Sequence, residues 1–208
     1  MARKRKRRTT SRRKKRSSST KWITTILVIL VVLMGGYIGH HLYQRHLQQE
    51  IIEKQQNSKR LFIKAIAPEA QAMQNQYHIK ASITMAQAIL ESNWGTSKLA
   101  SQYHNLFGIK GSYNGQSIIM RTAEYGAGGY YYINDAFRKY PSNYESVVDH
   151  GRFLATNSRY HNLLWKKDYA VVTNYLHTDG YATDPSYASS LNNVIRTYNL
   201  DAWDKEVF

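Results

Sequence analysis

The segment ASITMAQAIL, residues 81–90, contains no charged side chain and is followed directly by Glu91. At 100° per residue its apolar side chains lie on nearly every side of a helix, which is the pattern of a helix buried inside a protein. Gly95 stands where a helix of this length is expected to end. We therefore predict a central buried helix over residues 82–94.

Glu91 occupies a position that is unfavourable for a charged carboxylate. It falls in the last turn of the predicted helix, where the negative end of the helix dipole repels it, and beside Trp94, which would shield it from water. Both effects raise the pKa of the carboxyl group, as a general acid requires. The structural alternative is an exposed glutamate that pairs with Lys98 or Lys80.

The chain after residue 60 predicts a mostly helical domain with one small β-hairpin. Further helices are expected at Leu61–Tyr77, around Ser97–Tyr103, at Glu145–Thr156, near Tyr160–Trp165, at Tyr169–His177 and at Ser186–Tyr198. The β-rich runs Ser117–Tyr125 and Tyr130–Phe137 flank the sequence Gly-Ala-Gly-Gly, which indicates a hairpin. The expected fold class is α+β, with a cleft between the helices and the hairpin as the default binding site.

Positive charge is concentrated at the N-terminus. The 208 residues include 29 Lys and Arg against 14 Asp and Glu, a formal net charge of +15, and twelve of the basic residues lie within the first 21. The remainder of the chain is close to neutral, so the net charge describes a basic tail and not a nucleic-acid-binding domain. We predict no nucleic-acid partner.

Residues 22–39, WITTILVILVVLMGGYIG, are uncharged. About 18 residues at a rise of 1.5 Å reach ~27 Å, close to the thickness of a bilayer core, which predicts a transmembrane helix. The alternative is a cleaved signal peptide, which usually has a shorter apolar core and a small-residue cleavage site. The basic tail before the span predicts a cytoplasmic N-terminus that contacts anionic lipids, and a C-terminal domain outside the cell.

Residues 40–60 are rich in Gln, Glu, Lys and His, which predicts a solvated helical stalk before a domain at residues 61–204. The chain has no cysteine, which excludes disulfides, thiol catalysis and a cysteine zinc site. Its histidines show no metal-binding spacing after the stalk, so neither a metal nor another cofactor is expected.

Five short motifs follow one another through the predicted domain. They are ESNWG at residues 91–95, NLFGIKG at 105–111, TAEY at 122–125, AFRKY at 136–140 and GYATDPSYA at 180–188. In this order and spacing they resemble the signature of glycoside hydrolase family 73, the bacterial cell-wall N-acetylglucosaminidases related to the flagellar peptidoglycan hydrolase domain and to many autolysins. The similarity spans roughly residues 61–203.

The resemblance implies a lysozyme-like domain that hydrolyses the β-1,4 bond between N-acetylglucosamine and N-acetylmuramic acid in peptidoglycan glycan strands. It makes Glu91 the catalytic acid, Glu124 an acidic residue of the β-lobe implicated in activity, and Tyr181 a cleft tyrosine that supports catalysis or substrate placement. The alternative for Glu124 is a surface strand residue facing Arg121 or Arg138. The alternative for Tyr181 is a packed loop tyrosine.

Five further residues are expected at the substrate site. Tyr125 and Tyr131 would line sugar subsites, because flat rings with a polar edge suit the faces of sugars. Asn105 and Phe107 would shape the floor of the cleft, although Phe107 can equally pack in the core. Asp184 could lie near the acetamide group, or it could cap the following helix, with the proline after it as the first helical residue.

Glycoside hydrolysis ordinarily needs a second carboxylate beside the acid. A carboxyl separation of about 6.5–9.5 Å would indicate inversion with Glu124 as the base, and about 5–5.5 Å would suit a covalent route. A third route uses the 2-acetamido group of the substrate as the nucleophile, which gives Tyr181 or Asp184 more weight. The sequence leaves these routes open.

Two other functions are weighed against a glucosaminidase. A lytic transglycosylase or muramidase on the same fold also carries a Glu-Ser pair at the end of a buried helix, but a transglycosylase is expected to have a Gly-Leu-Met-Gln-like stretch where this chain has residues 105–111. The other is a catalytically silent, anchored glycan-binding protein. A single anchor without cysteine suggests a Gram-positive cell surface, and the oligomeric state is not predicted.

Overall fold

The computed structural model describes the backbone of residues 18–126 and 129–205, and the side chains of the same residues except 18–20, 123–126 and 130. The chain divides into two compact units, Met1–Gln55 and Gln56–Phe208. Helix α1 (Ser18–Tyr77) begins in the first unit and ends in the second.

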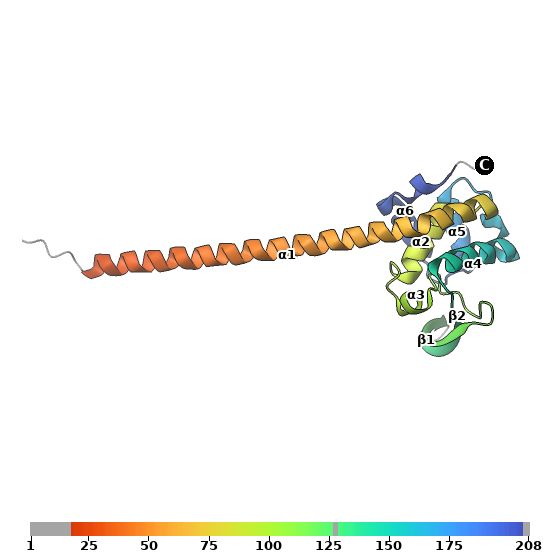
Figure 1. Cartoon of the computed structure of the whole chain (residues 1–208), viewed down its shortest axis with the longest axis horizontal. Helices are drawn as coiled ribbons and strands as arrows, with labels where there is room; N and C mark the ends of the chain where they lie inside the picture. Colours follow the sequence, from red (N-terminus) through yellow and green to blue (C-terminus); the bar gives the residue numbers. More distant parts are fainter. Residues whose placement is uncertain (1–17, 127–128, 206–208) are drawn as a thin grey trace, which may run out of the picture. The chain divides into compact units, whose positions relative to one another are not determined.

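The described part of the first unit belongs to α1 and carries exposed apolar side chains. Trp22 is 70% exposed and Val32 is 68% exposed, because no segment among the described residues covers them. By length and composition, α1 contains a stretch apolar enough to cross a membrane. The predicted span, the predicted stalk and the predicted helix at 61–77 all fall within this one helix (Figure 1).

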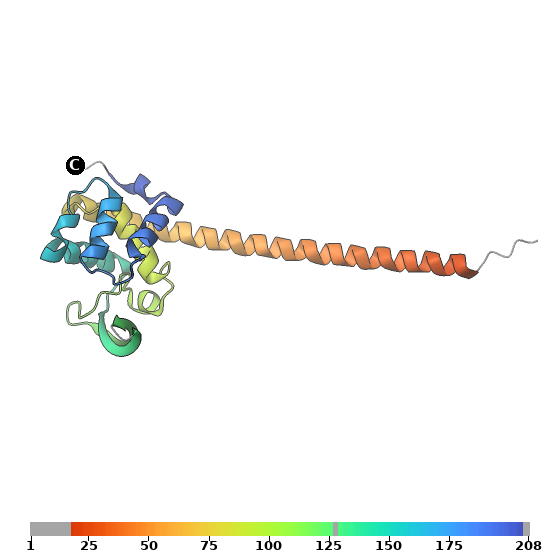
Figure 2. The ribbon, with the colours of Figure 1, turned by 180° about the vertical axis from the view of Figure 1, so that it is seen from behind.

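The second unit is mostly helical. Besides the end of α1, it contains α2 (Ala81–Ser92), α3 (Lys98–Tyr103), α4 (Asn143–Thr156), α5 (Tyr169–Thr178), α6 (Tyr187–Tyr198) and the 3-10 helices η1 (Ser158–Leu163) and η2 (Leu200–Trp203). Strands β1 (Ser117–Gly126) and β2 (Gly129–Arg138) form an antiparallel hairpin beside the helices (Figures 1 and 2). The expected α+β fold with a hairpin lobe is confirmed, and the predicted elements differ from the observed ones mainly at their ends.

Helix α2 is the centre of the second unit. Every residue from Ala81 to Ile89 is buried, and the helix packs against α4, α5, α6 and η2. This burial follows from the uncharged, apolar sequence, which presents no polar face to water. Leu90, which is 38% exposed, interrupts this burial, and Glu91 is also exposed, whereas the last residue, Ser92, is buried again.

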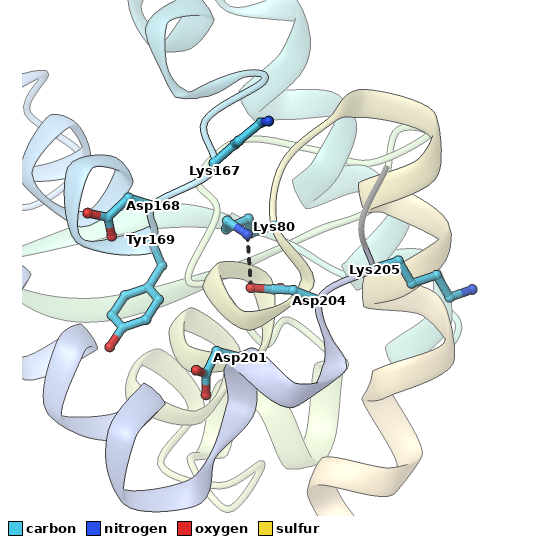
Figure 3. A pocket seen from close by; sticks show the side chains of 7 residues that line it. All are labelled: Lys80, Lys167, Asp168, Tyr169, Asp201, Asp204 and Lys205. Atoms are coloured by element: carbon cyan, nitrogen blue, oxygen red, sulfur yellow. Dashed lines mark hydrogen bonds and ion pairs between the residues drawn. The ribbon is translucent and has the colours of Figure 1, made fainter. Parts of the chain in front are cut away.

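The first turn of α2 is capped by side chains from other segments. Lys80, the residue before the helix, makes no capping bond of its own. The Ser82 backbone N–H instead donates to the Asp204 carboxylate at 2.8 Å, and the Ala81 N–H donates to Gln74 Oε1 at 2.8 Å. Asp204 also pairs with the Lys80 ammonium at 3.3 Å (Figure 3). These contacts satisfy backbone donors that a buried helix end would otherwise leave unpaired.

Helix α2 ends differently from the prediction. Its last residue is Ser92, and the left-handed cap is Asn93, with φ of 47°, where the sequence favoured Gly95. Trp94 and Gly95 continue the left-handed turn with φ of 62° and 74°. The Ser92 hydroxyl accepts a hydrogen bond from the Gly95 N–H at 2.7 Å, so a side chain replaces the helical acceptor and the turn tightens early.

The hairpin pairs residue for residue from Ser117 with Arg138 to Gly126 with Gly129, and the middle of its predicted turn, residues 127–128, lies outside the described residues. Its base is fixed to the helices by the Arg138 guanidinium, which forms an ion pair with the buried Asp149 of α4. The Gly111 N–H donates to the Ala136 carbonyl at 2.8 Å. The hairpin therefore forms one wall beside the helical core.

Candidate active site

A cleft of about 490 Å³ opens where the hairpin meets the helices. Glu91 of α2, Thr122 of β1 and Phe137 of β2 line it, together with the loop at 107–110, residues of α4 and η1, and the loop at 181–182. Its walls combine aromatic rings with a few polar groups, which is the usual character of a small-molecule site. The cleft predicted between the helices and the hairpin is therefore present.

A larger hollow of about 660 Å³ lies at the opposite end of α2. Figure 3 shows that its central charges, Lys80 and Asp204, face one another, while the side chains of Lys167 and Lys205 point away from this pair. Lys80 and Asp204 are 13% and 9% exposed, and Asp204 also binds the first turn of α2. We assign this hollow a structural role, since Asp204 already caps the helix and pairs with Lys80.

Glu91 combines access to solvent with a raised pKa. The side chain is exposed at the cleft, yet its carboxyl group lies in a concavity whose walls displace water. This desolvation raises the pKa of Glu91, and a hydrogen bond from Tyr187 partly lowers it. Among the described residues Glu91 forms no ion pair, and Lys80 pairs with Asp204 instead, so the structural alternative of a Glu91–Lys80 pair is wrong.

The aromatic surroundings of Glu91 differ from the expectation. Trp94 packs edge-on against Tyr198, with ring centroids 4.6 Å apart, and against Phe62 at 6.1 Å. It does not line the cleft, because the left-handed turn after Ser92 directs the chain away. The ring in contact with the Glu91 carboxyl is Tyr187, whose hydroxyl donates to Glu91 Oε1 at 2.7 Å.

Sequence reasoning missed Tyr187. Its side chain is 4% exposed at the start of α6, and its hydroxyl also accepts a hydrogen bond from Gln87 Nε2 at 3.1 Å. The tyrosine belongs to the motif GYATDPSYA, but no local spacing distinguishes it from a packing residue at a helix start. A signal was present in Gln87, the one amide side chain of the uncharged segment 81–90, which lies one turn before Glu91.

Tyr181 is one of the residues that line the cleft. Its ring stacks on Tyr187 with centroids 5.8 Å apart and lies 6.0 Å from the ring of Tyr160. Burial is the main reason why the pKa of Tyr181 is raised well above its ordinary value, and the nearby Glu91 adds to it. Tyr181 is therefore a neutral phenol beside the acid, and it is packed and cleft-lining at once.

The floor of the cleft is built from Phe107 and the residues that support it. Phe107 is buried and stacks on His150, with centroids 3.8 Å apart. Burial lowers the pKa of His150 to about 3, so the imidazole is neutral. Asn105 is also buried, and its amide bonds the backbone of Ile109 and Arg138. Asn105 thus shapes the loop under the cleft and does not itself line it.

The hairpin residues are placed by the strand register. Position 124 lies two residues after Thr122, which lines the cleft, and pairs across the sheet with Tyr131. Because alternate strand residues share a face, positions 124 and 131 share the face of Thr122, whereas position 125 falls on the other face. The side chains of Glu124 and Tyr125 lie outside the described side chains, and Tyr131 is 51% exposed.

Asp184 lies outside the cleft lining and supports the turn before α6. Its carboxylate accepts hydrogen bonds from the Ser186 N–H at 2.8 Å and from the Ser186 hydroxyl at 2.9 Å. These bonds lower the pKa of Asp184. The helix itself begins at Tyr187, so Asp184 stabilises the approach to the helix, two residues ahead of the N-cap Ser186.

The titratable side chains of the cleft suggest proton transfer to a ligand. Within the described residues, no group of three or more His, Asp or Glu side chains is placed to hold a metal ion. The site offers a carboxyl group with a raised pKa, neutral phenols and aromatic walls. A group of this kind can protonate a leaving oxygen while the rings pack on the faces of a sugar.

The fold and site define a helical domain with a hairpin lobe and an acidic residue between the two, the arrangement of a glycoside hydrolase. Residues 67–200 match the family model Glucosaminidase, described as mannosyl-glycoprotein endo-beta-N-acetylglucosaminidase. The chain belongs to this glucosaminidase family, glycoside hydrolase family 73. The family resemblance of the motifs is thereby confirmed.

Similar proteins agree with this assignment. The exo-glucosaminidase LytG of Bacillus subtilis (strain 168) is 39% identical over 163 residues, which cover 76% of this chain and 56% of that protein. The catalytic domain of the autolysin Auto from Listeria monocytogenes is 43% identical, with a TM-score of 0.64 over 71% of this chain and 88% of that one. A peptidoglycan hydrolase mutant from Sphingomonas sp. A1 is 33% identical, with a TM-score of 0.61 over 69% and 96%. This chain thus spans little more than half the length of LytG.

Proposed function

We propose that the protein is a membrane-anchored peptidoglycan hydrolase that cleaves the β-1,4 bond between N-acetylglucosamine and N-acetylmuramic acid. The observation that carries the proposal is the Glu91 carboxyl group, which is open to the cleft and has a raised pKa. Membership of a glucosaminidase family and the likeness to a structure named as a peptidoglycan hydrolase support the substrate class.

Glu91 acts as the general acid. Its raised pKa keeps part of the population protonated above the ordinary range of a glutamate, so that a proton is available for the departing glycosidic oxygen. The aromatic wall formed by Tyr181 and Phe107 excludes water from the side of the acid that faces the protein. Tyr181 contacts the sugar next to the bond that breaks.

Glu124 supplies the second carboxylate. The hairpin register supports this role, because position 124 shares a strand face with the cleft-lining Thr122. Tyr131, paired with position 124 across the hairpin, packs against the glycan strand. The route is tested by proton NMR of the first sugar anomer released, since inversion of the anomeric centre requires Glu124 to act on a water molecule, whereas retention requires a covalent or acetamide-assisted route.

The central test replaces Glu91 by Gln in the full chain. This change keeps the shape of the side chain and removes the transferable proton, so release of reducing ends from purified peptidoglycan should fall by about 10²- to 10⁴-fold. Glu145→Gln, a carboxylate change on α4 outside the cleft lining, is the matched control. Undiminished release by Glu91→Gln would refute the proposal.

Mass spectrometry of the products identifies the bond. A glucosaminidase leaves N-acetylglucosamine at the new reducing end, whereas a muramidase leaves N-acetylmuramic acid. A lytic transglycosylase leaves a 1,6-anhydro end. The proposal requires N-acetylglucosamine at the new reducing ends.

The anchor places residues 61–204 outside the membrane, with residues 22–39 as the span, residues 40–60 as the stalk and residues 1–21 in the cytoplasm. The apolar composition of α1 and the basic tail support this topology. The chain has no cysteine, so single cysteines report their location cleanly. In intact cells a membrane-impermeant maleimide should label Ser112→Cys and leave Ser11→Cys unlabelled.

A further inference from the structure

Gln87, Tyr187 and Glu91 form a chain of hydrogen bonds at the inner side of the cleft. Gln87 Nε2 donates to the Tyr187 hydroxyl at 3.1 Å, and this hydroxyl donates to Glu91 Oε1 at 2.7 Å. Gln87 and Glu91 are one turn apart on α2, so both side chains leave the same face of the helix. Tyr187 meets them from α6.

The direction of these bonds distinguishes the two carboxyl oxygens of Glu91. The single hydrogen of the Tyr187 hydroxyl is directed to Oε1, which therefore acts as an acceptor. A proton carried by the neutral carboxyl group is consequently placed on Oε2, for which the described residues provide no hydrogen-bond partner. A general acid needs its proton on the oxygen that can reach the substrate, and it needs that oxygen in a fixed position.

Tyr187 is held in place independently of its hydroxyl group. The ring is 4% exposed and stacks on Tyr181 with an interplanar angle of 19°. Gln87 is fully buried beneath it. A buried ring of this kind cannot touch a glycan strand in the cleft, so any effect of its hydroxyl on catalysis must pass through Glu91.

We propose that Tyr187 is a positioning residue for the hydrolysis proposed above, on which this inference rests. It orients the Glu91 carboxyl group so that the transferable proton sits on Oε2. Gln87 orients the Tyr187 hydroxyl in turn. The pair thereby links the buried centre of α2 to the atom that delivers the proton.

Titratable groups from several elements lie around the cleft that Glu91 lines. They are Tyr187 of α6, Tyr181 of the preceding loop, Tyr160 of η1, His150 of α4 beneath the floor, Lys110 of the loop before the hairpin, and position 124 of β1, whose side chain lies outside those described. Desolvation raises the pKa of Glu91 and the Tyr187 bond lowers it. Burial keeps the Tyr187 phenol neutral by raising its pKa, so loss of the hydroxyl should raise the pKa of Glu91 further.

The test uses the full chain in detergent micelles and soluble glycan strands as substrate. Tyr187→Phe keeps the stacked ring and removes only the hydroxyl group. We expect kcat to fall about tenfold, the loss of one buried hydrogen bond of ~1.4 kcal/mol, while KM stays within about twofold. The basic limb of the kcat profile should move to higher pH. Gln87→Met should shift both quantities in the same direction by a smaller factor.

Tyr198→Phe is the matched control. It removes a tyrosine hydroxyl from the other end of α6, where Lys59 donates to it at 3.1 Å, outside the cleft lining. Its kcat and pH profile should match those of the unmodified chain. An equal loss of kcat in Tyr198→Phe and Tyr187→Phe would mean a general packing effect and would overturn the proposal.

A second measurement does not depend on activity. Carbon-13 NMR follows the titration of the Glu91 carboxyl, identified by its absence in Glu91→Gln, and the pKa should rise in Tyr187→Phe and remain unchanged in Tyr198→Phe. If the unmodified chain cleaves no glycan, the proposed function fails while this titration still decides the role of Tyr187. If Tyr187→Phe leaves both the Glu91 titration and kcat unchanged, the proposed positioning role of Tyr187 is overturned.

Discussion

The Asp204 carboxylate accepts a hydrogen bond from the Ser82 N–H at 2.8 Å, which joins the C-terminal segment to the first turn of the helix that carries Glu91. The same carboxylate accepts from the Ser82 hydroxyl at 2.8 Å and pairs with Lys80. The helix is therefore fixed at one end by Asp204 and at the other by the turn at residues 93–95. Both fixtures are needed if Glu91 is to keep a constant position in the cleft.

Replacing Asp204 by Ala should lower the free energy of unfolding by about 2–4 kcal/mol. Loss of a helix cap costs about 0.5–2 kcal/mol, and Lys80 would keep a largely buried charge without its partner. Urea unfolding of the full chain in micelles measures the change. Asp201→Asn, an exposed carboxylate of the same hollow, should change it by less than about 0.5 kcal/mol. Equal effects of the two variants would contradict a capping role.

Asp149 should make the free energy of unfolding depend on pH in the acid range, below the ordinary pKa of an aspartate. Desolvation raises the pKa of Asp149, but hydrogen bonds from Tyr140, Arg138 and Arg152 outweigh it, so the pKa in the folded protein lies below 3.8. A lowered pKa contributes stability that is fully present above the unfolded value and is lost as the pH falls through the folded value. We expect the unfolding free energy to decline below about pH 3.8.

The Asp149→Asn variant tests this contribution. It should lower the unfolding free energy at pH 7 by about 3–5 kcal/mol, because Arg138 loses a buried partner, and it should flatten the acid decline. Arg152→Met should have a smaller effect, since its side chain is 57% exposed. A variant that retains the acid decline of the unmodified chain would show that another carboxylate causes it.

Position 95 requires glycine for two reasons, its left-handed backbone conformation and the close approach of the Phe62 ring. Its φ is 74°, and an added Cβ would lie 2.8 Å from Phe62 Cε2. Gly115 has a similar φ of 77°, but open space surrounds the same position. Gly115→Ala should therefore cost about 1–2 kcal/mol for the left-handed conformation alone, and Gly95→Ala about 1–3 kcal/mol more. Thermal unfolding of the two variants gives the difference, and equal losses would exclude the contact with Phe62.

Activity should fall on the basic side as Glu91 loses its proton. Desolvation places the pKa of Glu91 above 4.5, and a general acid works only while protonated. Initial rates should therefore persist above pH 4.5 and decline as the pH rises through the raised pKa. Rates of reducing-end release between pH 3 and about pH 9 test the prediction, which a basic limb centred at or below 4.5 would refute.

Two adjacent tyrosines, Tyr131 and Tyr132, lie on opposite faces of the hairpin and allow the two faces to be compared. Tyr131 shares the face of the cleft-lining Thr122, whereas Tyr132 lies on the other face, with the Arg121 guanidinium 4.3 Å from its ring centroid. Tyr131→Ala should raise KM about two- to tenfold, the loss of ~0.5–1.5 kcal/mol of ring contact. Tyr132→Ala, which removes an equally large exposed ring, should leave KM unchanged. If KM increased in Tyr132→Ala and not in Tyr131→Ala, the glycan would contact the opposite face of the hairpin from the one proposed.

The sequence by itself predicted the features that local pattern encodes. The uncharged run at 81–90 required a buried helix whichever segments cover it, and two β-rich runs around glycines required a hairpin. The position of Glu91, directly after that run, predicted the direction in which its pKa moves, but the desolvation comes from the cleft walls and not from Trp94. The ordered motifs indicated the family that the comparison confirmed.

The tertiary structure alone decided which side chains meet. Tyr187 lies 96 residues after Glu91, and Asp204 lies 122 residues after Ser82, so no periodicity of the chain relates either pair. Trp94, which follows the end of α2 at Ser92, likewise packs against Phe62, 32 residues before it, and Tyr198, 104 residues after it. Secondary structure follows from the polarity of near neighbours, whereas contacts between distant segments follow from how several buried faces pack together.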